Sequence, residues 1–272
     1  MLSINVKYFT KEASLENALE TIKKSGFDAL DYTPDLKNEA WEKEMSDTMS
    51  LIEKHGLSVH QTHAPFNRYG RWEGIHFSAV ENCLKATSSM GAKYMVVHGD
   101  EFRFKEEAYT PEKALEYNYR YFYPIVEKAQ ESNIKIAFEN VFEDNVTKPR
   151  FCSKTEELKA LIEKFNTDTV CCCWDTGHAG VAFGEEQPQK ILEMGKYIEC
   201  THIHDCGHGK DLHLPPHLGS INWNLCMDAF SKIGYNGAIN YEMVYGNIPE
   251  NLMQSFLSYL KKCADNFSIE KM

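Results

Sequence analysis

Short apolar runs alternate with stretches of helical periodicity from residue 2 to residue 265. In the segment SLENALETIKKSG the apolar residues share one face of a helix, which Ser14 can cap and Gly26 can end in a left-handed conformation. The run FDALDY follows at once, and the same order recurs along the chain. Ser153 and Glu156 have the spacing of a capping box and predict another helix start. The pattern predicts alternating strands and helices.

Eight apolar runs are predicted as strands: residues 2–6, 27–32, 57–63, 93–99, 134–140, 169–175, 197–205 and 238–243. Their nearly continuous apolar character suits parallel strands that are buried on both faces. This number of alternating elements predicts an α/β fold, a single closed (β/α)8 TIM barrel with one domain over residues 1–272. An open doubly wound sheet is the alternative, but no glycine-rich phosphate loop follows the first run.

Composition narrows the functional classes. The 272 residues are 43% hydrophobic and 25% charged, which is ordinary for a globular protein, and the net charge of −11 argues against a nucleic-acid or anionic-membrane partner. No stretch resembles a signal peptide or a membrane span, so we expect a cytoplasmic protein. The nine cysteines, three of them adjacent at positions 171–173, are interpreted as reduced thiols that pack as small apolar side chains.

Side chains that can ligate a metal stand at the ends of six predicted strands. They are His63, His98, Glu139, Asp175 with His178 three residues on, His202 with His204, and Glu242. The C-terminal ends of barrel strands converge on one mouth. A lone histidine at such a position is more often structural, but several carboxylates in one pocket would repel each other unless a cation neutralised them. The pattern therefore predicts a metal site at the mouth.

The core of this predicted site is Glu139, Asp175, His202 and Glu242. Three carboxylates and one imidazole form a site of mainly oxygen character, which is compatible with Mn, Mg, Co, Fe or Zn and selects none of them. The number of divalent ions, from one to three per chain, is left open by the residues.

Five motifs carry a family resemblance: FEN at 138–140, WDTGH at 174–178, THIHD at 201–205, DLHLPPHLGSINW at 211–223 and YEM at 241–243. Together they resemble the xylose isomerase-like TIM barrel superfamily, in its sugar phosphate isomerase/epimerase branch. The resemblance implies a metal held by Glu139, Asp175, His202 and Glu242, with His204 in a supporting role. His217 and Ser220 depart from the glycines usual in that loop.

The same superfamily contains the endonuclease IV type of DNA-repair enzyme, with three zinc ions, which is the alternative reading. His63, His98, His178, Asp211 and His213 occupy the positions of its additional ligands. The same five residues could instead orient ligands and substrate through hydrogen bonds. The motifs DTGH and HIHD differ from that enzyme type, and the acidic composition also argues against it.

Each reading implies its own chemistry. In an isomerase or epimerase of a sugar, sugar phosphate or related polyol, Glu139 and Glu242 would take a proton beside a metal-bound carbonyl and return it, while His178 binds a substrate oxygen. A hydride shift is also compatible with these residues. In a phosphodiesterase, closely spaced zinc ions would activate water. A non-catalytic sugar-binding barrel is a third class.

The segment HAPFNRYGRWEG supplies Arg68 and Trp72 as candidate substrate contacts, because arginine binds phosphate and aromatic rings stack on sugars. A lid packed on its own aromatic side chains explains the same residues. Lys148 and Arg150 could likewise meet an anionic group. We expect a small-molecule sugar partner, and the sequence leaves open whether the chain forms a homo-oligomer.

Overall fold

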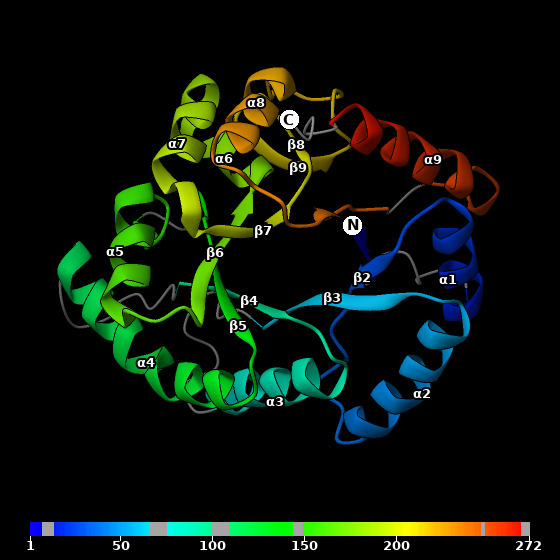
Figure 1. Cartoon of the computed structure of the whole chain (residues 1–272), viewed down its shortest axis with the longest axis horizontal. Helices are drawn as coiled ribbons and strands as arrows, with labels where there is room; N and C mark the ends of the chain where they lie inside the picture. The colour runs from blue at the N-terminus through cyan, green and yellow to red at the C-terminus, as the bar shows by residue number, and fades with distance from the viewer. Residues whose placement is uncertain (7–13, 66–74, 100–108, 144–148, 246–247, 268–272) are drawn as a thin grey trace.

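Eight parallel strands form one curled sheet in the computed structural model, which describes residues 1–6, 14–65, 75–99, 109–143, 149–245 and 248–267 (Figure 1). The strands are β1 Leu2–Asn5, β2 Ala29–Asp31, β3 Ser58–His63, β4 Tyr94–His98, β5 Lys135–Glu139, β6 Val170–Asp175, β7 Ile198–His202 and β10 Ile239–Tyr241. Their order is β10-β1-β2-β3-β4-β5-β6-β7. A parallel bridge between Ile203 and Tyr241 joins the two edges. The predicted (β/α)8 barrel is confirmed.

Helices surround this ring of strands (Figure 1). They are α1 Leu15–Lys24, α2 Trp41–Lys54, α3 Ile75–Ser89, α4 Pro111–Glu131, α5 Thr155–Phe165, α6 Thr176–Phe183, α7 Gln187–Met194, α8 Trp223–Lys232 and α9 Glu250–Asn266, with short 3-10 turns at Gly184–Glu186 and Gly195–Tyr197. Alternate strand residues face them, as when Ile4 of β1 packs in one apolar cluster with Leu19 of α1 and Leu257 of α9. Helices from the two ends of the chain thus cover adjoining strands.

Of two helix starts predicted from capping residues, the structure confirms one and corrects the other. Ser14 Oγ accepts the N–H of Asn17 at the start of α1, and Gly26 adopts φ +88° just beyond its end, as the sequence predicts. The predicted capping box is wrong. Helix α5 starts at Thr155, and the Ser153 hydroxyl donates to the Glu143 carboxylate at 3.4 Å instead of capping the helix.

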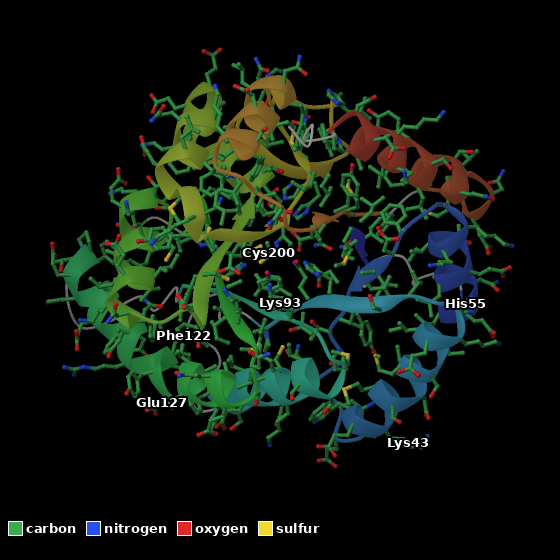
Figure 2. All side chains as sticks on the ribbon, in the orientation of Figure 1. Lys43, His55, Lys93, Phe122, Glu127 and Cys200 are labelled. Carbon is green, nitrogen blue, oxygen red and sulfur yellow. The ribbon has the colours of Figure 1, made fainter. Side chains whose placement is uncertain are left out.

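Small and aromatic side chains fill the middle of the barrel, below its mouth. One buried cluster there consists of Tyr94, Val96, Ala137, Cys171, Cys173 and Cys200. Figure 2 shows side chains filling the ring of strands, with Cys200 near its centre. Cys172 points outward to the helices because side chains alternate along a strand. All nine thiols are free and buried, as the sequence predicts.

The predicted strand 197–205 ends earlier than expected, at His202. After Ile203 the chain forms an antiparallel hairpin of β8 Asp205–Gly207 and β9 Lys210–Leu214, which the sequence analysis did not anticipate. The Asp205 carboxylate accepts hydrogen bonds from the indole N–H of Trp223 at 2.7 Å and the backbone N–H of Ile221 at 3.1 Å. It thereby fixes the segment that follows the hairpin.

In the part of the chain that the structure describes, no helix has the length and apolar character that crossing a membrane requires.

Candidate metal centre

Four side chains from neighbouring strand ends meet at the barrel mouth. One oxygen or nitrogen from each of Glu139, Asp175, His202 and Glu242 lies within 4.8 Å of the others. Glu139, Asp175 and His202 are the last residues of β5, β6 and β7, and Glu242 directly follows β10. The register pairs Asp175 with His202 across the sheet. The parallel topology therefore brings together the four residues that the sequence nominates.

Glu139 lies at the centre of a ring of imidazoles and is only 1% exposed. Its Oε2 lies 3.1 Å from Nε2 of His63, 3.2 Å from Nε2 of His98 and 3.3 Å from Nδ1 of His202. Its Oε1 lies 3.0 Å from Nδ1 of His178. Burial would raise the pKa of Glu139, but the imidazoles, His202 first, hold it well below its usual value. Glu139 is therefore a carboxylate, the form that ligates a cation.

Asp175 is positioned by both of its neighbouring elements. Its Oδ1 accepts the backbone N–H of His178 at 2.6 Å and so caps α6. The side chain of Asn140 accepts the N–H of Asp175 at 2.7 Å and donates to its carbonyl at 2.9 Å. The other carboxylate oxygen, Oδ2, lies 2.9 Å from Nε2 of His204. The carboxylate is therefore held from two sides as it points into the mouth.

His202 is oriented by a residue that the sequence analysis missed. Its Nε2 lies 3.2 Å from Oδ2 of Asp31, the last residue of β2, and that oxygen also accepts hydrogen bonds from Gln61 at 3.1 Å and Asn240 at 3.2 Å. A carboxylate at Nε2 favours the hydrogen there and directs the Nδ1 lone pair into the site. The same strand-end rule applied to FDALDY would have found Asp31.

The environment of His202 Nδ1 fits a bound cation. This nitrogen is buried and has no hydrogen-bond partner among the described residues. It faces carboxylate oxygens of Glu139, Glu242 and Asp175 at 3.3, 3.7 and 3.8 Å. Burial lowers the pKa of His202, but Glu242 and Glu139 raise it well above its usual value, so positive charge is favoured at this point. A divalent ion among these four ligands would satisfy both the lone pair and the charges.

Asp211 and His213 of the hairpin lie against the outer side of the site. The Asp211 Oδ2 atom is 3.4 Å from Nε2 of His213 and 3.6 Å from Nε2 of His178. Burial would lower the pKa of His213, but its hydrogen bond to Asp211 raises it to about 9. The ring of His213 stacks on His204 with 4.0 Å between centroids. One ligand atom from each of His204, His213 and Glu242 also lies within 4.8 Å of the others.

The remaining sequence candidates divide into two groups. Arg150 lies at the mouth, where its Nη2 donates to Nδ1 of His98 at 3.3 Å. Arg68, Trp72 and Lys148 lie outside the described residues. Their assignment as substrate or anion contacts stays a prediction.

Comparison with known proteins identifies the family. The model of the xylose isomerase-like TIM barrel family matches residues 19–263. The chain therefore belongs to this family, in agreement with the resemblance noted in the motifs.

Solved structures share the fold over almost the whole chain. A D-tagatose 3-epimerase-like protein is 22% identical with a TM-score of 0.74, covering 98% of this chain and 99% of that one. D-psicose 3-epimerase, solved in the presence of D-fructose, is 14% identical with a TM-score of 0.78, covering 97% and 98% of the two chains. The IolI protein with a bound zinc atom is 18% identical with a TM-score of 0.78, covering 100% and 99%.

Proposed function

We propose that this chain is a divalent-metal-dependent isomerase or epimerase of a sugar, sugar phosphate or related polyol. The observation that carries the proposal is the cluster of Glu139, Asp175, His202 and Glu242 around a buried imidazole nitrogen that has no hydrogen-bond partner among the described residues. Similarity of fold to two proteins named as 3-epimerases or epimerase-like, and to a zinc-bound barrel, supports this choice.

Those four residues would hold the ion. A bound divalent cation supplies Lewis-acid polarisation of the substrate carbonyl, which makes the neighbouring C–H bond more acidic. The donor set suits Zn, Mn, Co or Mg, and the proposal is independent of which one is native.

Glu242 and Glu139 are the proposed proton-transfer groups. They extend from β10 and β5, with β6 and β7 between them, so they approach the mouth from separated directions. The Glu242 side chain is 20% exposed, whereas Glu139 is 1% exposed. Glu139, which is a carboxylate, would take the proton as the C–H bond breaks and its electron pair moves toward the carbonyl. Glu242 in its carboxylic acid form would return a proton to the opposite face of the same carbon. This exchange inverts the stereocentre.

His178 is the proposed contact for a substrate oxygen. Its Nδ1 lies 3.0 Å from the Asn140 carbonyl and 3.0 Å from Oε1 of Glu139, which fixes the ring. Its Nε2 is directed toward the Asp211 carboxylate on the hairpin. A substrate hydroxyl could take the place of this carboxylate as the partner of Nε2. Arg68 and Trp72 would complete the substrate pocket in this proposal.

The test is exchange of a substrate C–H hydrogen with deuterium from D2O, followed by mass spectrometry. The metal-loaded protein is incubated with D-fructose, D-psicose and D-tagatose and with their phosphates. We expect Glu242→Gln to lower exchange by roughly 10²–10⁴-fold, the usual loss of a general acid or base. Glu250→Gln, an exposed change of the same kind on α9, should leave it unchanged. Exchange that survives in Glu242→Gln would remove Glu242 from the mechanism, and no exchange with any of these sugars or sugar phosphates would contradict the proposed function.

A further inference from the structure

His98 occupies a position from which it could bind a second metal ion. It ends β4, pairs in register with Glu139 of β5, and places Nε2 3.2 Å from Oε2 of that carboxylate. His63 reaches the same oxygen at 3.1 Å, with its Nδ1 2.8 Å from the Ala64 carbonyl. His63, His98 and Glu139 would form a three-ligand metal site if both Nε2 atoms offered lone pairs.

Arg150 determines which nitrogen of His98 carries the hydrogen. Its Nη2 donates a hydrogen bond to Nδ1 of His98 at 3.3 Å. A guanidinium has only donors, so Nδ1 must supply the lone pair. The hydrogen of the neutral ring is then on Nε2 and is directed at Glu139. A nitrogen that carries a hydrogen has no lone pair for a metal.

The position of Arg150 is fixed by several contacts, and the residue is 3% exposed. Its Nη1 donates to the Phe142 carbonyl at 3.3 Å, and its backbone N–H donates to the Glu143 carboxylate at 3.1 Å. The guanidinium also lies 5.9 Å from the centre of the Phe142 ring. This places a permanent positive charge next to His98, where it repels a second cation.

We infer that Arg150 makes His98 a hydrogen-bond donor to Glu139 and so prevents His63, His98 and Glu139 from holding a second divalent ion. Arg150 is a positioning residue that limits the metal content of the site. Among the described residues, the group of ligand atoms within 4.8 Å of one another that includes His63 contains Glu139 and His202, and not His98. Since His202 is a proposed ligand of the first ion, His63 and Glu139 alone would be left for a second ion if His98 is a donor, fewer than the three ligands that catalytic zinc sites use. The inference rests on the proposed function only for the first ion.

The direct test is long-range ¹H–¹⁵N NMR of the histidine rings in the wild-type chain, without metal and with one equivalent of Zn²⁺. Both states should show His98 with its hydrogen on Nε2. A hydrogen on Nδ1, or an Nε2 signal that changes to that of a metal ligand when zinc is added, would overturn the inference. This measurement needs no variant and no substrate.

The second test is the zinc content of Arg150→Met, which removes the donor and the charge at similar length. Zinc bound per chain should rise from about one to about two. Lys154→Met, an exposed loss of charge nearby, should leave it at the wild-type value. A folded Arg150→Met protein that binds no more zinc than the wild type would contradict the inference, and if this variant does not fold, the NMR result decides. Loss of the proposed epimerase activity alone, with the His98 tautomer as expected, would reject the proposed function and leave this inference standing.

Discussion

His202 and His98 contact the same Glu139 oxygen at nearly the same distance, 3.3 and 3.2 Å, but their outer nitrogens face partners of opposite charge. The Asp31 carboxylate accepts the hydrogen of His202 Nε2, which leaves Nδ1 as a lone pair in the site. The Arg150 guanidinium donates to His98 Nδ1, which leaves a hydrogen pointing into the site. The partner on the far side of each ring therefore decides between a ligand and a donor.

The largest effect is expected from Glu139→Gln, because both histidines depend on this carboxylate. The change keeps the volume of the side chain and removes the charge that a divalent ion needs. Zinc affinity of the metal-free protein, measured by titration calorimetry, should fall by more than the roughly 10–100-fold typical of losing an outer hydrogen-bond partner. Glu250→Gln is the matched control. Unchanged affinity would show that Glu139 is not a ligand.

Glutamine substitutions at His202 and His98 should affect zinc binding unequally. Glutamine at either histidine position offers an amide N–H donor but no imidazole lone pair. His202→Gln should therefore weaken zinc binding by at least about 100-fold, while His98→Gln, which keeps a donor to Glu139, should change it by less than about tenfold. The measurement is again calorimetric titration. Equal losses in the two variants would mean that His98 also binds the metal.

Asp31→Asn tests whether this carboxylate sets the tautomer of His202. The amide no longer carries the negative charge that favours hydrogen on Nε2 of His202, so we expect zinc binding to weaken by about 10–100-fold. Asp35→Asn, an exposed change in the loop after β2, is the control. Zinc affinity unaffected by Asp31→Asn, with the His202 tautomer unchanged by NMR, would remove Asp31 from the account.

The smallest effect is expected at His60, a histidine of β3 outside the metal centre. Its Nε2 is buried without a hydrogen-bond partner among the described residues, and burial lowers its pKa from 6.5 to about 4. Between these pKa values the unfolded chain binds the proton and the folded chain does not. The free energy of unfolding therefore decreases as pH falls below about 6.5.

Between pH 7 and pH 6 the decrease in the free energy of unfolding that His60 causes is less than about 1 kcal/mol. Urea unfolding of the metal-free protein should show a smaller loss of stability over this range for His60→Gln than for the wild type. Equal losses in the two proteins would mean that His60 is not held neutral by burial.

Most of the barrel could be predicted because each strand and helix has a local pattern. The run TVCCCWD marks β6 without any knowledge of its neighbours. The ends of six strands likewise nominate the metal-type residues, since parallel topology alone places them at one mouth. The β8–β9 hairpin was missed because its strands, DCG and KDLHL, contain no continuous apolar run.

The roles of individual site residues could not be predicted from local pattern. Asp31 and His202 are 171 positions apart, and Arg150 and His98 are 52 apart. Both pairs join side chains from different parts of the chain, and each decides the tautomer of a ring. Arg150 was expected to meet an anion, because a sequence gives the charge of a side chain and not the nitrogen that it faces.

The proposed single metal centre is best tested by counting the tightly bound divalent ions per chain, by elemental analysis of protein purified without chelator or metal affinity resin. We expect about one ion per chain in the wild type, and its loss in Glu139→Gln. Close to three zinc ions per chain would contradict it and favour the phosphodiesterase alternative, for which cleavage of abasic DNA is the next assay. No bound ion, and no uptake of added zinc, would contradict the metal centre itself.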